Sequence, residues 1–395
     1  MKSLKVLHVI AGMDPKAGGV CQAVRMIISG LKDHDIINEV ISLDSANARY
    51  LVGLPFVVHA IGEGKGPWGY NGRLRVWLTE HLKEYEIVIL HGLWLYPGYA
   101  LRKSLDLLRR DGQANPKFFV MPHGMLDPYF QLAPGRRLKA IRNRIFWNLI
   151  ERKIINDADG LLFTCEMEMI LARKTFKKYF PKKELIVGLG IEAAPPYSEA
   201  MSEAFKAKLP MEEIGSYLLF ISRIHEKKGI DLLVKAYSNL KVMQPGIPAL
   251  VIAGPGLETE FGKTIQQLAR ECSDIYFTGM LTGNAKWGAF FECEAFVLPS
   301  HQENFGIAVV EAMACAKPVL ISNQVNIWKE ILNSGGGLVS DDSLWSVQDM
   351  LEKWIALSKD EKKLMGVCAK ACFESNFAVK PSALRLINAI NPLNK

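Results

Sequence analysis

Two carboxylates eight positions apart, Glu303 and Glu311, lie in the most informative stretch of the sequence, residues 295–311. The stretch starts with an apolar run that predicts a buried strand, and Phe305-Gly306 then opens a segment that predicts a helix. A strand that leads into a helix N-terminus favours an anion there, because free backbone N–H groups and the helix dipole both attract negative charge.

The carboxylates themselves would not bind that anion. Glu303 in the loop and Glu311 inside the expected helix are better suited to accept hydrogen bonds from hydroxyls of the same ligand. A diphosphate joined to sugar hydroxyls describes a nucleotide sugar, which is the ligand that this stretch favours.

A second basic motif, residues 222–229, follows the first strand expected in the second half of the chain. Arg223 and Lys228 could converge on one phosphate pair, the arginine through its planar fork and the lysine as a point charge. A solvated charged loop is the alternative, and the position at a strand end favours the phosphate.

A glycine pair, Gly18-Gly19, ends the loop of residues 12–19 between the first expected strand and helix. Paired glycines allow backbone to approach a phosphate, although a flexible turn is an equally good interpretation. The loop lacks the G-x-G-x-x-G spacing of dinucleotide sites and the Gly-Lys-Ser/Thr of P-loops, which argues against NAD enzymes and NTPases.

Two histidines, His91 and His123, each end an apolar strand and each precede a glycine. A histidine there can hydrogen-bond a substrate hydroxyl or assist proton transfer, although lone histidines are more often structural. We predict that His123 has the functional role, whereas His91 is equally well interpreted as a scaffold residue near Trp94.

The chain has 395 residues, of which 49% are apolar and 23% charged, so two soluble domains are expected. No apolar run is long enough for a spanning helix, and residues 5–11 are interpreted as a first strand, not as a signal peptide. The seven cysteines are scattered without a Cys-x-x-Cys pair, which argues against a disulfide framework, structural zinc and an oxidising compartment.

Short apolar runs alternate with helical patterns along the chain, which predicts α/β domains with parallel sheets. Pro195, Pro196 and Pro210 in residues 188–215 indicate a linker, so we expect one Rossmann-like domain over 1–195 and another over 196–395. The expected strands cover residues 5–10, 39–43, 87–91, 117–121, 160–163, 185–187, 217–221, 250–253, 275–277, 295–298 and 318–321.

The net charge of +7 is uneven: residues 1–195 carry 28 − 19 = +9, and most of that excess lies in residues 136–183, which hold 13 basic and 5 acidic side chains. Part of this cluster falls on an expected helix, residues 138–156, whose apolar residues include Ile141, Ile145 and Leu149. A partly buried helix with a solvated basic side is slightly favoured over contact with anionic lipid or a phosphate-bearing acceptor. Nucleic acid is a weaker candidate, since no motif for it is present.

These motifs resemble those of glycosyltransferase family 4, the retaining nucleotide-sugar transferases of GT-B fold, over residues 5 to about 377. Glu303-Asn304-Phe305-Gly306 with Glu311 is similar to the family's E-x7-E motif. The resemblance implies two Rossmann-like domains that face each other across a cleft, an acceptor-side N-terminal domain and a C-terminal donor domain. It also implies that residues 377–395 cross back to the N-terminal domain.

The resemblance further implies a role for each motif residue. The catalytic residues would be His123 and Glu303, with no metal and no cofactor besides the nucleotide-sugar substrate. The donor-binding residues implied are Gly18, Gly19, Arg223, Lys228, Asn304, Phe305, Gly306 and Glu311.

The implied function is transfer of a sugar, most simply a hexose, from a nucleoside-diphosphate donor to a glycan or lipid-linked glycan in bacterial polysaccharide or lipopolysaccharide assembly. Residues 122–128, Pro-His-Gly-Met-Leu-Asp-Pro, resemble members that work there. A sugar epimerase of the same fold and a non-catalytic nucleotide-sugar binding protein are the alternatives. We expect a cytoplasmic protein, at the inner face of the plasma membrane if the basic cluster contacts lipid.

Overall fold

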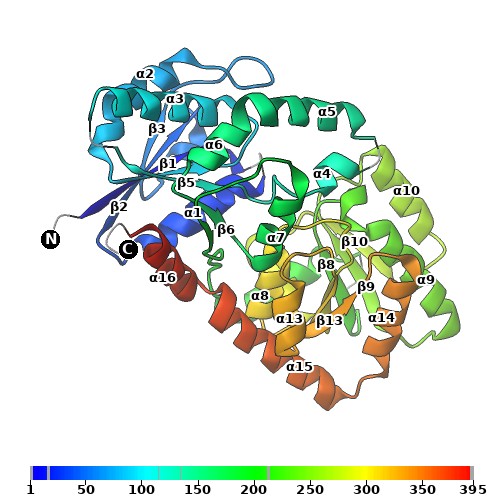
Figure 1. Cartoon of the computed structure of the whole chain (residues 1–395). Coiled ribbons are helices and arrows are strands. Elements are labelled where there is room, and N and C mark those ends of the chain that lie inside the picture. Colours follow the sequence, from blue (N-terminus) through cyan, green and yellow to red (C-terminus); the bar gives the residue numbers. More distant parts are fainter. Residues whose placement is uncertain (1–2, 16–17, 114, 134, 211–213, 392–395) are drawn as a thin grey trace. The chain divides into compact units, whose positions relative to one another are not determined.

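The computed structural model describes the chain except residues 1–2, 16–17, 114, 134, 211–213 and 392–395 (Figure 1). The chain divides into two units, Met1–Gly190 with Val379–Lys395, and Ile191–Ala378. Each unit contains one parallel sheet with helices between successive strands, so the predicted α/β class is confirmed. The C-terminal helix therefore belongs to the unit that contains the first strand.

The first unit has a seven-stranded sheet in the order β3-β2-β1-β4-β5-β6-β7, in which all neighbours are parallel. The chain builds the sheet outward in one direction from β1 and in the other direction from β4. The loops that follow these two neighbouring strands therefore diverge at the carboxyl ends of the strands. The strands are β1 (Leu4–Val9), β2 (Ile36–Ser42), β3 (Val57–Ala60), β4 (Ile87–His91), β5 (Lys117–Met121), β6 (Gly160–Phe163) and β7 (Glu184–Ile186).

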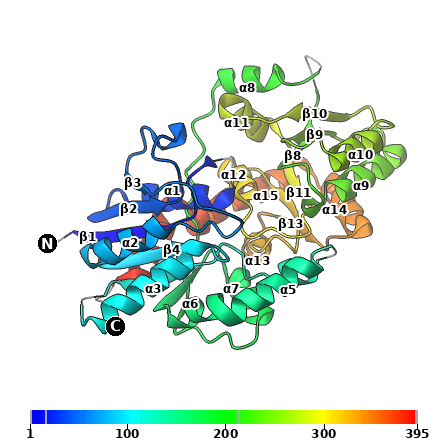
Figure 2. The same cartoon turned by 90° about the horizontal axis from the view of Figure 1, so that it is seen from above.

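Helices cover both faces of this sheet (Figure 2). Successive residues of β2 show this, because Val40 packs in the cluster that contains Val24, whereas Ile41 packs in the cluster that contains Leu74 and Leu101. The helices are α1 (Gly19–Leu31), α2 (Gly72–His81), α3 (Tyr96–Arg110), α4 (Tyr129–Leu132), α5 (Arg137–Phe146), α6 (Arg152–Asp157), α7 (Glu166–Thr175) and α16 (Val379–Ile390).

The second unit has a six-stranded parallel sheet in the order β10-β9-β8-β11-β12-β13. The strands are β8 (Tyr217–Ile221), β9 (Ala249–Ala253), β10 (Ile275–Gly279), β11 (Ala295–Leu298), β12 (Val319–Ser322) and β13 (Gly337–Ser340). The helices are α8 (Glu199–Lys206), α9 (Ile230–Met243), α10 (Glu260–Ala269), α11 (Gly283–Glu292), α12 (Ile307–Ala314), α13 (Trp328–Ser334), α14 (Leu344–Ala356) and α15 (Lys359–Cys372).

Two strands, β3 and β13, are absent from the sequence-based prediction, and each lies at the edge of its sheet. An edge strand has one neighbour and needs less apolar patterning than a central one, and β13 also follows two glycines, Gly335 and Gly336. The helix expected over 138–156 is continuous, formed by α5, a π-helical turn at Trp147–Glu151 and α6.

The linker predicted over 188–215 is not simply a connection, because α8 lies within it. This helix packs tightly on α11, since a Cβ added at Gly288 would lie 2.1 Å from the Met201 carbonyl oxygen. Residues 211–213 of the predicted linker lie outside the described residues.

Two further expectations from the sequence concern disulfide bonds and membrane-spanning helices. All seven cysteines are free thiols. Among the helices that the structure describes, none is both long enough and apolar enough to span a bilayer.

Candidate functional site

Lys228 and Glu303 form an ion pair between Nζ and Oε2. Only 11% of the lysine side chain and 20% of the glutamate side chain are exposed. Burial opposes ionisation of the carboxyl group, but the Lys228 ammonium, together with Lys227 and the Asn304 N–H, outweighs that effect and lowers the pKa of Glu303. The structure therefore brings the predicted diphosphate cation and the predicted hydroxyl-binding carboxylate into contact.

Gly229 explains how Lys228 reaches the loop after β11. Its φ of 63° lies in the left-handed region, and a Cβ there would lie 1.9 Å from the carbonyl oxygen of Pro299. Any side chain at this position would separate the 3-10 turn Glu226–Lys228 from the end of β11. Glycine thus allows the close approach that places the lysine beside Glu303.

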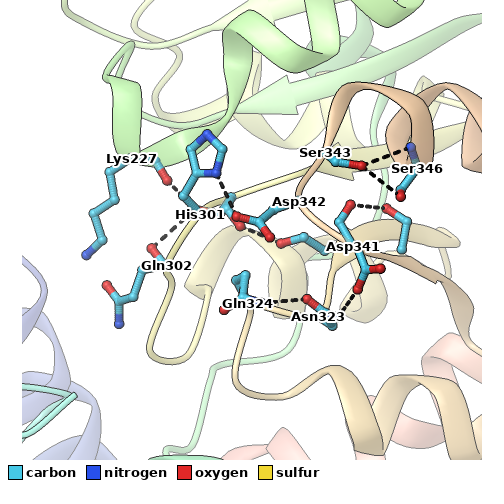
Figure 3. Close-up of polar contacts among 12 residues, drawn as sticks. Lys227, His301, Gln302, Asn323, Gln324, Asp341, Asp342, Ser343 and Ser346 are labelled. Atoms are coloured by element: carbon cyan, nitrogen blue, oxygen red, sulfur yellow. Dashed lines mark hydrogen bonds and ion pairs between the residues drawn. The ribbon is translucent and has the colours of Figure 1, made fainter. Parts of the chain in front are cut away.

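The loop between β11 and α12 is anchored by neighbouring segments (Figure 3). The Ser300 hydroxyl and the His301 backbone N–H both donate to the Lys227 carbonyl oxygen, each at 2.9 Å. The His301 Nδ1 atom lies 2.8 Å from Oδ2 of Asp342, in the loop after β13. This loop is therefore tied to two strand ends other than its own, which restricts where Glu303 can lie.

The backbone of Glu303 is also fixed directly. Its N–H donates to the Gln324 carbonyl oxygen at 2.9 Å, and its carbonyl oxygen accepts from the Asn326 N–H at 3.0 Å. These two bonds form a short parallel bridge between the loop after β11 and the loop after β12. The Glu303 side chain consequently projects from a backbone that is held on both sides.

Glu311 lies on α12 and forms an ion pair with Lys286 of α11, with 2.8 Å between Nζ and Oε1. Only 15% of the Glu311 side chain is exposed. Lys286 could not be recognised from its own segment of the sequence, and its ammonium also lies 4.4 Å from the ring centroid of Trp287. The two carboxylates of the E-x7-E motif thus each have their own lysine partner.

The residues between the two carboxylates have different surroundings. Phe305 is buried against Phe377, with 5.6 Å between ring centroids, so its side chain has a packing role. The Asn304 Oδ1 atom accepts from the Asn326 amide at 3.4 Å. Gly306 caps α12 with a φ of 75° and without a side-chain hydrogen bond, so no N-cap side chain covers the first amides of the helix.

Arg223, the second predicted diphosphate cation, is exposed at the end of β8. The backbone on either side of it is fixed, because Ser222 N–H donates to the Ala253 carbonyl and Ile224 N–H to the Pro255 carbonyl. Arg223 and Lys228 therefore emerge from one loop, but the arginine is solvated whereas the lysine is buried.

The predicted glycine pair lies at the start of α1, where Gly18 is the N-cap with a φ of 123° and Gly19 is the first helical residue. Lys16 and Ala17 of this motif lie outside the described residues. Gly18 lines a cavity of about 220 Å³ in the first unit, together with Gly12, His91 and Met125. The loops after β1 and β4 thus share one mostly apolar cavity.

His123 follows β5 with a φ of 52° and connects to two other histidines. Its Nε2 atom lies 3.0 Å from Nδ1 of His91, whose Nε2 atom lies 2.9 Å from Nδ1 of His8. The histidine ladder, defined as His8, His91 and His123, continues to Asn38, whose Oδ1 atom lies 3.0 Å from Nε2 of His8. His8 and Asn38 were not identified from the sequence.

The ladder is held in the neutral form. Burial lowers the pKa of His123 to about 4, and burial, only partly opposed by the Asn38 bond, lowers that of His8 to about 4. Burial and repulsion from its two neighbours lower the pKa of His91 further below its usual value. All three rings are therefore uncharged at neutral pH.

The loop that carries His123 is supported by a buried carboxylate, Glu168 of α7. Its oxygens accept from the Gly124 N–H at 2.6 Å and from the Thr164 N–H and hydroxyl at 2.8 and 2.6 Å. These bonds connect the end of β5 to the end of β6, and they position the ring of His123 through its neighbour in the chain.

The helix expected over 138–156 is partly buried, as the slightly favoured interpretation of the sequence has it, but the buried side chains are Trp147, Ile154 and Ile155, not the apolar residues named from the sequence. Leu138, Ile141, Ile145 and Leu149 are 83%, 56%, 53% and 65% exposed. Within α5 the one buried side chain is Asn143. The periodicity of the sequence correctly predicted a helix. It could not show that, among the described residues, no other helix or strand covers the apolar side of α5.

Residues 201–371 match the family model described as glycosyl transferases group 1. The O-antigen chain mannosyltransferase C of Escherichia coli is 29% identical over 192 residues, 47% of this chain and 48% of that protein. The chain spans about half the length of the curated relatives it matches.

Solved structures resemble the whole chain. Sucrose-phosphate synthase of Thermosynechococcus elongatus has a TM-score of 0.74 at 18% identity and covers 99% of both chains. HepE of Anabaena in complex with UDP-glucose has a TM-score of 0.73 at 14% identity, over 99% of this chain and 100% of that one. These likenesses show the fold, which is GT-B as predicted.

Proposed function

Because residues 201–371 match the model of glycosyl transferases group 1, we propose that the chain is a retaining glycosyltransferase that uses a nucleoside-diphosphate sugar. The transferred group is a hexose and the acceptor is a glycan or a glycolipid of cell-surface polysaccharide or lipopolysaccharide. The unit Ile191–Ala378 binds the donor, and the other unit provides the acceptor side. The observation that carries the proposal is the buried contact between Lys228 and Glu303.

The chemistry of sugar transfer accounts for this pair. Cleavage of a sugar–phosphate bond develops positive charge on the sugar and negative charge on the departing diphosphate. Lys228, Arg223 and the amides at the start of α12 stabilise the diphosphate. A donor whose phosphates lie beside the ammonium and whose hydroxyls donate to Glu303 leaves neither charge of the pair without a partner.

Glu311, His123 and the glycine pair provide the remaining contacts to the substrates. Glu311 accepts hydrogen bonds from the ribose hydroxyls, and its ion pair with Lys286 holds the carboxylate in place. His123 contacts a hydroxyl of the sugar or of the acceptor. The amides beside Gly18 and Gly19 serve as a further contact for the donor phosphates.

Donor turnover distinguishes this proposal from the alternatives. Incubation with a nucleotide sugar and acceptor should release the nucleoside diphosphate only when acceptor is present, and the new glycosidic bond should keep the anomeric configuration of the donor. An isomerised donor would support an epimerase instead. Tight donor binding without any turnover would support a non-catalytic binding protein.

The nucleotide base can be found by thermal shift. The names of the similar proteins suggest mannosyl and UDP-glucose donors as the first compounds to test. A donor present at 100 times its Kd should stabilise the folded protein by about 2.7 kcal/mol, so UDP-, GDP- and ADP-sugars can be ranked by the rise in Tm.

We also propose that α5 makes a peripheral contact with the surface of an anionic membrane. Four exposed apolar residues, Leu138, Ile141, Ile145 and Leu149, alternate with basic residues over this helix and the π-helical turn. The net charge of residues 136–183 is 13 − 5 = +8, which complements anionic lipid headgroups. This contact would bring the protein to the lipid-linked acceptor.

A further inference from the structure

The orientation of the Asn38 amide is fixed by two contacts at opposite ends. Its Nδ2 atom donates to the Ile36 carbonyl oxygen at 3.3 Å, and its Oδ1 atom lies 3.0 Å from Nε2 of His8. A flipped amide would place two acceptors, Oδ1 and the Ile36 carbonyl, against each other. Asn38 therefore presents an oxygen to His8.

That oxygen determines the hydrogen position on every ring of the ladder. A neutral imidazole has one N–H, and Oδ1 of Asn38 can only accept, so the hydrogen of His8 lies on Nε2. His8 Nδ1 is then an acceptor, so His91 must donate from Nε2. His91 Nδ1 is in turn an acceptor, so His123 must donate from Nε2.

We propose that Asn38, acting through His8 and His91, is a positioning residue that locks His123 in the Nε2–H tautomer and keeps its Nδ1 lone pair available. The three rings lie in the first unit at the ends of β1, β4 and β5, where His8 and His91 are buried and His123 is partly buried. Asn38 lies on β2 next to β1, where it pairs in register with Val6. One polar side chain inside the sheet thus determines what a site histidine can bind.

The consequence is a restriction on substrate contacts, which rests on the proposed function. A bare Nδ1 accepts a hydrogen bond and cannot donate one, so His123 selects a hydroxyl of the sugar or acceptor and not a phosphate oxygen. The lone pair is also in the form needed to accept a proton. A His123 ring with its hydrogen on Nδ1 would have the opposite preference.

The tautomers can be observed directly by NMR on the full chain labelled with ¹⁵N-histidine at pH 7. Bare and protonated ring nitrogens give well-separated signals, and signals of the ladder are assigned by comparison with His123→Gln. The expected result is one neutral Nε2–H tautomer at His8, His91 and His123. A His123 with its hydrogen on Nδ1, or with both nitrogens protonated, would overturn the proposal.

The Asn38→Leu variant tests the origin of the lock, because leucine has a similar volume but no acceptor. The His123 signal should become a mixture of both tautomers, and kcat should fall at least twofold while the KM for donor stays unchanged. His59→Gln is the control, since His59 pairs with Glu39 on the same sheet and lies outside the ladder. A purely Nε2–H His123 in Asn38→Leu would refute the role of Asn38.

The spectrum of the parent protein decides the tautomer even if Asn38→Leu does not fold. It also separates this proposal from the proposed function. An Nε2–H ladder in a protein that turns over no nucleotide sugar would leave the lock intact and reject the transferase. Sugar transfer by a protein whose His123 carries its hydrogen on Nδ1 would do the reverse.

Discussion

Lys228 and Glu303 are 75 positions apart in the chain, yet they form a largely buried ion pair that joins the loop after β8 to the loop after β11. The contact depends on Gly229, which lets the two loops approach. The two charges neutralise each other inside the protein, so neither is available to a ligand without loss to the other. A ligand that binds here must therefore satisfy both charges, as a diphosphate with sugar hydroxyls does.

The first prediction concerns Glu303→Gln, which removes the carboxylate and leaves the Lys228 ammonium without its partner. Nucleoside diphosphate should bind as tightly as in the parent or up to about tenfold more tightly, because the diphosphate no longer competes with the Glu303 carboxylate for the Lys228 ammonium. Turnover should fall about 100-fold or more, because the hydroxyl contact is lost. Calorimetry with the nucleotide and a steady-state assay measure the two effects.

A variant with weakened nucleotide binding and unchanged turnover would contradict this division of roles. Glu260→Gln on α10 is a suitable control, since Glu260 is an exposed carboxylate of the same unit that pairs with Lys263. It should change neither quantity.

The second prediction is that Glu311 reads the ribose. Glu311→Gln should weaken nucleotide binding about tenfold, because a charged acceptor of two hydroxyl hydrogen bonds is replaced by a neutral amide. The parent should prefer the ribonucleotide over the 2′-deoxyribonucleotide, and the variant should lose most of that preference. Competition calorimetry with both nucleotides gives the ratio.

Lys286→Met separates the carboxylate from its lysine partner. If the carboxylate makes the ribose contact, this variant keeps a preference for the ribonucleotide. Equal affinity of the parent protein for both nucleotides would refute the ribose contact.

The third prediction is a loss of stability in mild acid. The pKa values of His8 and His123 are lowered to about 4 and that of His91 is also lowered, so between pH 6.5 and 4.5 protons bind these rings mainly in the unfolded chain. Their contribution to stability is complete above pH 6.5 and is lost as the pH falls, by roughly 2 kcal/mol at pH 4.5 for each of His8 and His123. Urea unfolding at a series of pH values measures this slope.

The buried carboxyl group of Glu151 makes the free energy of unfolding depend on pH in the opposite direction. Burial raises its pKa to about 8, although a hydrogen bond from the Trp94 N–H acts in the other direction. The native carboxyl group keeps its proton up to about pH 8, so its contribution is complete below pH 4.5 and is lost as the pH rises. One such group offsets about one ring, so stability should be highest near pH 7.

A free energy of unfolding that stays constant between pH 6.5 and 4.5 would contradict the buried, neutral ladder. His34→Gln provides the control because His34 is outside the ladder. It should leave the slope unchanged.

The fourth prediction concerns the exposed apolar side of α5. The protein should bind vesicles that contain anionic lipid and should be released by high salt, because the basic residues act through screened charge. Ile141→Ser with Ile145→Ser should weaken this binding about tenfold or more, because two apolar side chains no longer enter the interface. Vesicle sedimentation measures the bound fraction.

Val242→Ser with Met243→Ser is the matched control, since these apolar residues are also exposed but lie at the end of α9. Binding that is insensitive to both salt and the α5 substitutions would reject the membrane contact.

Much of this architecture could be predicted from the sequence because central parallel strands leave strong signals. Apolar runs located all nine central strands and the edge strands β7 and β10, whereas β3 and β13, at the other two sheet edges, have weaker patterns. Glu303, the glycines and Lys228 could be proposed as site residues because they lie next to strand or helix ends, and Glu311 because it stands eight positions after Glu303.

Long-range partnerships could not be predicted in the same way. Lys286 reaches Glu311 from a different helix, and Asn38 reaches the histidine ladder from a neighbouring strand. Each of these residues is unremarkable in its own segment, and it gains its role only from the register of the sheet and the packing of helices. The exposed side of α5 is a similar case, because periodicity does not say whether another element covers an apolar face.

The most direct test of the central claim is the affinity of Lys228→Ala for nucleoside diphosphate, measured by calorimetry beside the exposed-lysine control Lys263→Ala. Because Lys228→Ala leaves Glu303 without a cation, the double variant Lys228→Met with Glu303→Gln checks that folding is retained. The account predicts at least a 100-fold loss of affinity, about 2.7 kcal/mol, in both Lys228 variants and none in the control. Unchanged affinity in a folded Lys228 variant would contradict it.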